Sequence, residues 1–126
     1  MNLNQITIPS LNVEKAAIFY KTLGLKLIVE AFPKYVRFEC PNGDSTFSIH
    51  KVDELPTGHG VSIYFECDNL DILVAELQTK GIVFNKLPED KSWLWREAHL
   101  EDLDGNIIIL YHAGKNRKNP PWRIQQ

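Results

Sequence analysis

The sequence predicts one α+β domain made of two βαβββ modules, which form a curved mixed sheet with a concave pocket. Three observations support this fold class: an internal repeat, one amphipathic helix in each copy, and three strand-like runs after each helix. The 126 residues, of which 44% are apolar, suit one domain with a proper core. A single module would leave one sheet face bare, so two modules are expected to share a concave face that binds a ligand.

The internal repeat pairs residues 6–27 with residues 63–84 without a gap. Identity between the copies is low, but their apolar positions coincide. In each copy a short alternating strand leads through a polar turn into a helix. We therefore expect module one at residues 3–52 and module two at residues 61–113. Residues 53–60 contain glycines and a proline and are interpreted as a linker.

The first module is predicted to open with a strand at residues 3–8. Its helix has apolar side chains at steps of three and four: Val13, Ala16, Ala17, Tyr20 and Leu23. Gly24 follows, where a helix favours a left-handed terminal residue. Three strands come next, at residues 25–32, 35–40 and 45–52, and Pro41-Asn42-Gly43-Asp44 is a hairpin turn between the last two.

The second module repeats this order, beginning with a strand at residues 61–67. The apolar helix positions are Leu70, Leu73, Val74 and Leu77, and Gly81 takes the place of the first module's glycine. Strands are predicted at residues 82–87, 93–101 and 106–112. The turn Asp102-Leu103-Asp104-Gly105-Asn106 joins the last two strands.

Residues 114–126 form a basic C-terminal tail with four positive charges and no carboxylate side chain. The tail lacks helical or strand periodicity, so we expect it to be extended. Pro120 and Pro121 stiffen it, which favours docking of Trp122 on its own domain or on a partner subunit. Disorder of the tail is the alternative.

Composition argues against several classes of partner. The net charge of −2 gives no general attraction to nucleic acid or to an anionic membrane. No apolar run approaches the length of a membrane span, and no signal peptide is recognised. Cys40 and Cys67 form no CxxC pair and suit a reducing compartment, so we expect a cytoplasmic protein.

Strand alternation assigns alternate side chains to the helices and their neighbours to the pocket. The residues expected to contact a ligand are Gln5, Arg37, Ser62, Tyr64, Glu66, Trp95 and Tyr111. This mixture of aromatic and polar groups suits a small planar ligand held by stacking and a few directed bonds. Arg37 is the expected anion anchor. Its alternative role is a cross-strand ion pair with Glu39 or Glu66.

Two histidines are candidates for acid–base chemistry. His50 or His99 could act as a general base, oriented by Glu66, Glu97 or Glu101. The alternative is that both are exposed strand residues or members of a structural polar network. We therefore name His50, His99 and Glu97 as candidate catalytic residues, and the sequence leaves open whether the protein is an enzyme.

Several motifs resemble those of one family. Phe19-Tyr20 followed by Leu23-Gly24-Leu25 resembles the start of vicinal oxygen chelate proteins, where F-Y is followed a few residues later by L-G. These proteins include glyoxalases, bleomycin resistance proteins and extradiol dioxygenases. Asp104-Gly105-Asn106 followed by Leu110-Tyr111 resembles the D-G-N ending, and Asp68-Asn69-Leu70-Asp71 resembles the entry to the second helix. The resemblance covers nearly all of residues 3–113 and implies the same fold.

The resemblance also implies four positions for the family's divalent metal ligands, on the first and last strand of each module. Gln5 fits the first position and Ser62 the corresponding position in module two. Ile109 stands where the family has a glutamate, and the remaining position is Phe47 or Ser48. Ile and Phe have no donor atom and neutral Ser is a poor one, so we expect no standard metal site and no cofactor. A divalent metal would need a rearranged site, for example one built from His50, His99 and Glu97.

The leading functional hypothesis is a small-molecule-binding protein of the bleomycin-resistance type. The resemblance implies that such proteins sequester a ligand without a metal, commonly in a groove between two subunits, so a homodimer is expected. The first alternative is a lyase, isomerase or dioxygenase with a rearranged or absent metal site. The second is an accessory domain without chemistry.

Overall fold

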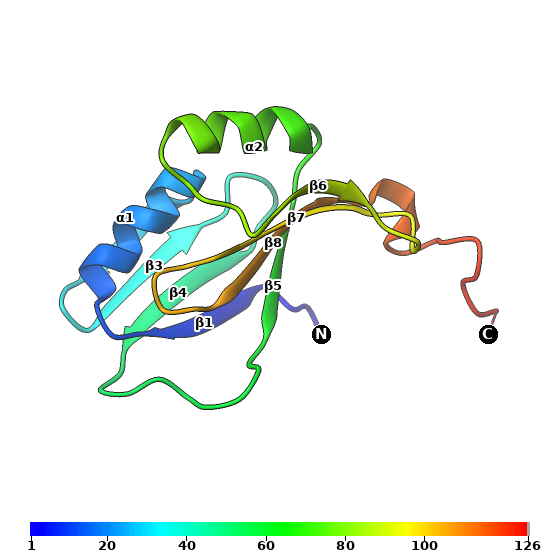
Figure 1. The fold of residues 1–126 in the computed structure, drawn as a ribbon. Helices are drawn as coiled ribbons and strands as arrows, with labels where there is room; N and C mark the ends of the chain where they lie inside the picture. Colours follow the sequence, from blue (N-terminus) through cyan, green and yellow to red (C-terminus); the bar gives the residue numbers. More distant parts are fainter. Residues whose placement is uncertain (126) are drawn as a thin grey trace. The chain divides into compact units, whose positions relative to one another are not determined.

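The computed structural model describes residues 1–125 of the chain. Contacts divide these residues into two compact units, and each unit has a four-stranded mixed sheet and one α-helix (Figure 1). The first unit comprises residues 1–60 together with 102–106, and the second comprises the other described residues. Each unit has the order βαβββ, which confirms the predicted α+β class and the two modules.

The first unit contains β1 (Gln5–Ser10), α1 (Val13–Leu23), β2 (Lys26–Ala31), β3 (Tyr35–Glu39) and β4 (Thr46–Lys51). Its strands lie in the order β1-β4-β3-β2. β1 runs parallel to β4, and the other neighbouring pairs are antiparallel. α1 packs against β2, β3 and β4 (Figure 1).

The second unit contains β5 (Ser62–Glu66), α2 (Leu70–Thr79), β6 (Lys86–Asp90), β7 (Arg96–Glu101) and β8 (Ile107–His112). The strand order is β5-β8-β7-β6, with the same parallel and antiparallel pairing as in the first unit. α2 packs against β6, β7 and β8. Neither α-helix, nor any other helix within residues 1–125, is long and apolar enough to cross a membrane.

Asparagine residues precede both helices, and glycine residues follow them. Asn12 caps α1, because its side chain accepts a hydrogen bond from the Lys15 N–H at 3.1 Å. Asn69 precedes α2 but makes no such side-chain bond. Gly24 and Gly81 have φ of 110° and 90°, so both take the left-handed conformation that ends a helix.

The core of each unit lies between its helix and one face of its sheet. In the first unit the α1 residues Val13, Ala16, Ala17 and Tyr20 are buried, as are the strand residues Ile8, Val36, Phe38, Phe47 and Ile49. In the second unit the buried set includes Leu70, Val74, Leu77, Ile63, Ala98, Leu100, Ile108 and Leu110. Burial of one such large apolar side chain stabilises a fold by roughly 1.5–3 kcal/mol.

A buried hydrogen-bond cluster completes the first unit around Asp102. The Asp102 carboxylate accepts hydrogen bonds from the backbone N–H groups of Asp104 and Asn106, both at 2.9 Å. It also accepts one from the Asn106 side-chain amide at 2.8 Å and one from the Tyr20 hydroxyl at 2.6 Å. Tyr20 is fully buried and Asp102 is 6% exposed. The turn between β7 and β8 is thus fixed by a residue of α1.

Four segments differ from the sequence-based expectation. β1 was expected at residues 3–8 but spans Gln5–Ser10, because its pairing with β4 runs from Gln5 to Ser10. β6 starts at Lys86, not at residue 82, because the preceding residues have no strand partner and only Asn85 bonds to the His99 carbonyl, at 2.8 Å. β7 starts at Arg96, because Lys91 to Trp95 form a tight turn in which Leu94 has φ of 68°. The tail forms a short 3-10 helix at Gly114–Asn116 where an extended chain was expected. Its last residue, Gln126, lies outside the described residues.

Candidate functional site

The face of the second sheet opposite α2 carries most of the predicted ligand-contacting side chains. Cross-strand pairing places them in rows, since paired residues point to the same face. One row is Tyr64, Ile109 and His99, and the next is Glu66, Tyr111 and Glu97. Trp95 packs against the end of these rows with Ile107 and the buried residues Ile109, Tyr111 and Ala113. We call the group Tyr64, Glu66, Trp95, Glu97, His99 and Tyr111 the aromatic face.

Three aromatic rings form the centre of the aromatic face. Trp95 stacks on Tyr111 with 4.8 Å between ring centroids and 29° between ring planes. Tyr64 meets both rings edge-on, at 5.8 Å from Trp95 and 5.4 Å from Tyr111. These are favourable aromatic geometries, and the Tyr64 side chain is 45% exposed. Ring surface is therefore accessible at Tyr64.

Glu97 places a buried carboxylate beside the rings. It is 2% exposed and accepts two hydrogen bonds, from Trp93 Nε1 at 2.7 Å and from His99 Nε2 at 2.9 Å. The negative charge of Glu97 also raises the pKa of Tyr64, although burial of Tyr64 contributes more. His99 uses Nε2 for this bond, and within residues 1–125 its Nδ1 has no hydrogen-bond partner. The pair therefore has the geometry of an oriented imidazole.

Glu66, a predicted ligand contact, is occupied by the tail. Its carboxylate accepts hydrogen bonds from the backbone N–H groups of Ala113 and Gly114, at 2.8 and 2.9 Å. Arg117 approaches the same carboxylate at 3.8 Å. Trp95 Nε1 adds a longer bond to the Asn116 carbonyl, at 3.4 Å. These contacts tie the start of the tail to the second unit.

The equivalent face of the first sheet is polar. Its rows are Gln5, Thr46 and Glu39; Thr7, Ser48 and Arg37; and Pro9, His50 and Tyr35. We call the residues Gln5, Thr46, Ser48, Tyr35 and Arg37 the polar network, because hydrogen bonds connect them in series. The register also settles the remaining metal-ligand position, since Ser48 points to this face and Phe47 to the core.

The bonds of the polar network converge on Tyr35. Gln5 accepts from the Thr46 hydroxyl and donates from Nε2 to Ser48 Oγ at 2.8 Å. Ser48 Oγ lies 2.6 Å from the Tyr35 hydroxyl, and Arg37 Nε donates to that hydroxyl at 3.0 Å. Loss of solvation tends to raise the pKa of Tyr35, but the bonds with Ser48 and Arg37 and the Arg37 charge outweigh it and lower the pKa.

The structure brings some of the predicted residues together and leaves others apart. Tyr64, Trp95, Tyr111, Glu97 and His99 share the aromatic face, and Gln5 and Arg37 share the polar network. Ser62 and His50 are exposed and make no side-chain hydrogen bond within residues 1–125. The sequence did not indicate the bond from Trp93 to Glu97. Tyr35 and Ser48 lie at alternate strand positions on the face of Arg37 and Gln5, but no signal in the sequence showed that they bond to each other.

The four positions implied for a metal do not offer a suitable donor set. The Gln5 amide is engaged with Thr46 and Ser48, Ile109 has no donor atom, and Ser62 offers only a neutral hydroxyl. Among residues 1–125, no three His, Cys, Asp or Glu side chains are grouped in a way that could hold a metal ion. Divalent transition metals prefer imidazole, carboxylate or thiolate ligands, so these residues do not fit the family's metal.

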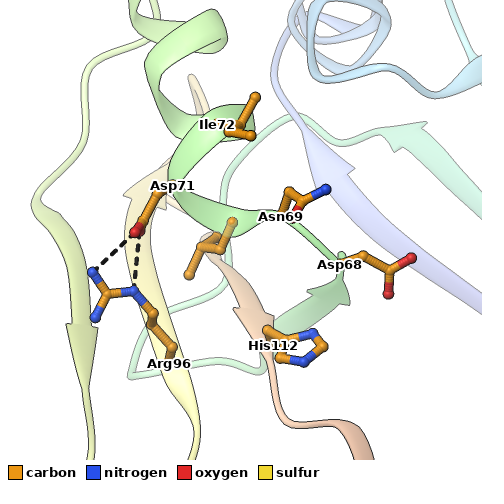
Figure 2. Close-up of a pocket in the computed structure, with 7 residues that line it drawn as sticks. Asp68, Asn69, Asp71, Ile72, Arg96 and His112 are labelled. Atoms are coloured by element: carbon orange, nitrogen blue, oxygen red, sulfur yellow. Dashed lines mark hydrogen bonds and ion pairs between the residues drawn. The ribbon is translucent and has the colours of Figure 1, made fainter.

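A separate hollow of about 340 Å³ lies at the start of α2 (Figure 2). Asp68, Asn69, Asp71, Arg96 and His112 are among its lining residues. Arg96 points at Asp71 and binds it at 3.0 and 3.3 Å, and it also binds Asp90 at 3.0 Å. His112 Nδ1 bonds to the Cys67 carbonyl at 2.9 Å. The Arg96 guanidinium is thus already paired with two carboxylates. The aromatic face is therefore the stronger candidate for a ligand-binding site.

Comparison with solved structures identifies the same fold in other proteins. A glyoxalase/bleomycin resistance protein/dioxygenase from Nocardioides has a TM-score of 0.78 at 20% identity, over 99% of this chain and 90% of that one. Lactoylglutathione lyase from Agrobacterium tumefaciens has a TM-score of 0.74 at 15% identity, over 88% and 92%. A bleomycin resistance determinant encoded on transposon Tn5 has a TM-score of 0.74 at 20% identity, over 89% and 98%.

No curated protein matches the chain. The family model described as the Glyoxalase/Bleomycin resistance protein/Dioxygenase superfamily matches residues 2–110, which is most of the sequence and nearly all of both modules. This match agrees with the Phe19-Tyr20, Leu23-Gly24 and Asp104-Gly105-Asn106 motifs and with the two βαβββ units. The chain belongs to the Glyoxalase/Bleomycin resistance protein/Dioxygenase superfamily.

Proposed function

We propose that this chain binds a small, flat aromatic molecule on its aromatic face, without the family's usual metal. The observation that carries the proposal is the contact of Trp95, Tyr111 and Tyr64 beside the buried Glu97. Stacking on such rings suits a planar ligand, and the chain shares its fold with the bleomycin resistance determinant encoded on transposon Tn5. The absence of suitable donors at Ser62 and Ile109 supports binding without a metal.

A cationic ligand suits this face better than an anionic one. The negative charge of Glu97 acts on Tyr64, and that of Glu66 acts on Tyr111, where Arg117 at 3.8 Å from Glu66 offsets part of it. Carboxylates near aromatic rings favour a positive charge, and a cation over a ring gains about 0.5–2 kcal/mol. The proposed ligand class is therefore a flat aromatic compound that carries a positive charge.

A homodimer is part of this proposal. The resemblance to bleomycin resistance proteins implies a binding groove between two subunits, and a second copy of the chain would extend the surface around Tyr64. Light scattering during gel filtration tests this part, since a dimer has twice the 14.5 kDa mass of the chain. A monomer at all concentrations up to about 1 mM would reject it.

Binding can be tested with ethidium as a flat cationic probe, measured by calorimetry and by thermal shift. Tetraethylammonium, which is cationic but not aromatic, is the matched ligand control. Tyr64→Ala is expected to weaken ethidium binding about 10-fold, since one aromatic contact contributes about 1–1.5 kcal/mol. Trp95→Ala should weaken it further. Trp122→Ala removes an exposed ring of the tail and should leave binding unchanged. Equal affinity for both ligands, or no effect of Tyr64→Ala, would reject the proposal.

The hydrogen bond between Glu97 and His99 favours a second candidate, an acid–base enzyme such as a lyase or isomerase. An imidazole held by a buried carboxylate at 2.9 Å, with its other nitrogen unbonded, can accept a proton from a bound substrate. This candidate predicts that a bound ligand is converted and that His99→Gln abolishes conversion while binding persists. A pure binder returns the ligand unchanged over hours.

A further inference from the structure

In the polar network of the first unit, the hydroxyl hydrogen of Tyr35 has no acceptor among residues 1–125. Either oxygen of the 2.6 Å contact between Ser48 and Tyr35 can be the donor. We assign the donated hydrogen to Ser48, because Ser48 is fully buried, Gln5 Nε2 already donates to it, and the reverse direction would leave its single hydrogen without a side-chain acceptor among residues 1–125. Arg37 has only donors and directs its Nε hydrogen at the same oxygen. Tyr35 therefore accepts two hydrogen bonds, and its own O–H hydrogen remains available for a ligand.

Arg37 itself is a cation without a carboxylate partner. It is exposed, and within residues 1–125 its two terminal nitrogens, Nη1 and Nη2, make no hydrogen bond or ion pair. The two glutamates weighed as its partners are engaged elsewhere: Glu39 with Lys26 at 3.7 Å, and Glu66 with the tail. Nε donates to the Tyr35 hydroxyl, and the guanidinium carbon lies 5.5 Å from the centroid of the Tyr35 ring. These contacts use neither Nη1 nor Nη2, so the outer fork can bind a ligand.

We propose that Arg37 and Tyr35 form a binding site for the carboxylate group of a small molecule, on the polar face of the first sheet. The Arg37 fork would bind the carboxylate oxygens, and the Tyr35 O–H would donate a third hydrogen bond to one of them. One cation and a neighbouring hydroxyl match a planar anion with a single charge. A dianion such as phosphate would meet one cation only, with Glu39 on the same face.

Two further features support this site. The pKa of Tyr35 lies below its usual range, because the Ser48 and Arg37 bonds together outweigh the loss of solvation, so its O–H is a strong donor. Ser48 bonds to the Tyr35 hydroxyl, and Gln5 holds Ser48 in place. The Tyr35 hydroxyl is thus positioned before a ligand binds, as a preorganised site requires. Neither feature involves the aromatic face, so this inference does not depend on the proposed function.

The test is a titration with acetate, followed through the Arg37 Nε–H signal in nitrogen-15 NMR spectra. Acetamide, which has the same shape but no charge, and inorganic phosphate are the comparison ligands. We expect saturable binding of acetate, no binding of acetamide and weaker binding of phosphate. Arg37→Gln should abolish acetate binding, and Tyr35→Phe should weaken it about 10-fold, as expected for loss of one hydrogen bond to a charged group.

The controls separate this site from nonspecific charge and from misfolding. Arg123→Gln removes an exposed arginine of the tail and should leave acetate binding unchanged. Arg37 is exposed, so Arg37→Gln should keep the wild-type melting temperature and circular dichroism spectrum. Binding of acetate that survives Arg37→Gln, or equal response to acetate and acetamide, would overturn the proposal. Tighter binding of phosphate than of acetate would overturn the assignment to carboxylates. Ethidium binding is also measured with the Arg37→Gln variant, because it tests the aromatic face independently of the carboxylate site.

Discussion

Replacement of Tyr20 by phenylalanine removes one hydroxyl from the buried hydrogen-bond cluster around Asp102. The ring is kept, so its contacts with Phe47 at 4.7 Å and Phe38 at 6.3 Å remain. Asp102 keeps its other three hydrogen bonds but loses the shortest one, at 2.6 Å. The substitution therefore isolates one buried hydrogen bond to a carboxylate.

The expected cost follows from the type of bond. A hydrogen bond to a charged group contributes about 1.5–3 kcal/mol, so Tyr20→Phe should lower the free energy of unfolding by about 2 kcal/mol. For 126 residues the entropy of unfolding is roughly 0.26 kcal/mol per kelvin, which converts this loss into a decrease of about 8 °C in the melting temperature.

The difference between wild type and variant should shrink at high pH. Burial and the negative charge of Asp102 raise the pKa of Tyr20 far above its usual range, so folded Tyr20 keeps its proton. In the unfolded chain the Tyr20 hydroxyl ionises near pH 10. The contribution of this hydroxyl to the free energy of unfolding is therefore complete below pH 10. Above that pH the contribution decreases by about 1.4 kcal/mol per pH unit. The phenylalanine side chain of the variant cannot ionise. At pH 11 the gap should therefore be smaller by about 1.4 kcal/mol than at pH 8.

Urea unfolding at pH 8 and pH 11 measures both effects. Tyr64→Phe is the matched control, because it removes a hydroxyl that is 45% exposed as a residue and makes no hydrogen bond within residues 1–125. Its cost should stay below about 0.5 kcal/mol. If Tyr20→Phe costs no more than Tyr64→Phe, or if its cost is the same at both pH values, the buried bond to Asp102 does not stabilise the first unit as argued.

Three further changes have defined outcomes. Gly24→Ala places a side chain at φ of 110° where no atom lies within 4 Å, so the cost is conformational, about 1–2 kcal/mol by urea unfolding; an unchanged midpoint would contradict it. Glu66→Ala removes the acceptor for Ala113 and Gly114, and trypsin should cut at Lys115 and Arg117 about 10-fold faster, a result that an unchanged digestion rate would exclude. Tyr35 should ionise at lower pH than free tyrosine, because its bonds with Ser48 and Arg37 outweigh desolvation; the early part of the absorbance titration at 295 nm should vanish in Tyr35→Phe and persist in Tyr64→Phe.

Periodicity in the sequence was sufficient to predict the fold and to predict which face of the sheet most strand side chains point to. Gly24 and Gly81 located both helix ends, because few other residues accept a positive φ. Strand alternation placed Glu97 and His99 on one face, since they are two residues apart on β7. The start of β6 was wrong, because an apolar run shows strand propensity but not whether a partner strand lies beside it.

The partners of the polar side chains could not be predicted in the same way. Strand alternation predicts which face a side chain points to, but not the rotamer that it adopts or the partner that it contacts. The sequence therefore contained no signal for the bond from Trp93 to Glu97. It also contained none for the bonds between Glu66 and the tail. The choice between Phe47 and Ser48 depended on the number of residues in the hairpin before β4, and one residue changes the face.

The turn at Asp102–Asn106 has a consequence for the order in which this chain folds. The first unit needs the Tyr20–Asp102, Leu11–Asp104 and Pro9–Asn106 bonds, which join residues 82, 93 and 97 positions apart. The ribosome must therefore synthesise β5, α2, β6 and β7 before the Tyr20 hydroxyl of α1 can bond to the Asp102 carboxylate. Contacts of such long range slow folding. We therefore expect the first unit to stay incompletely folded until the second half of the chain has left the ribosome. Folding of the first unit is then completed late in the synthesis of the protein.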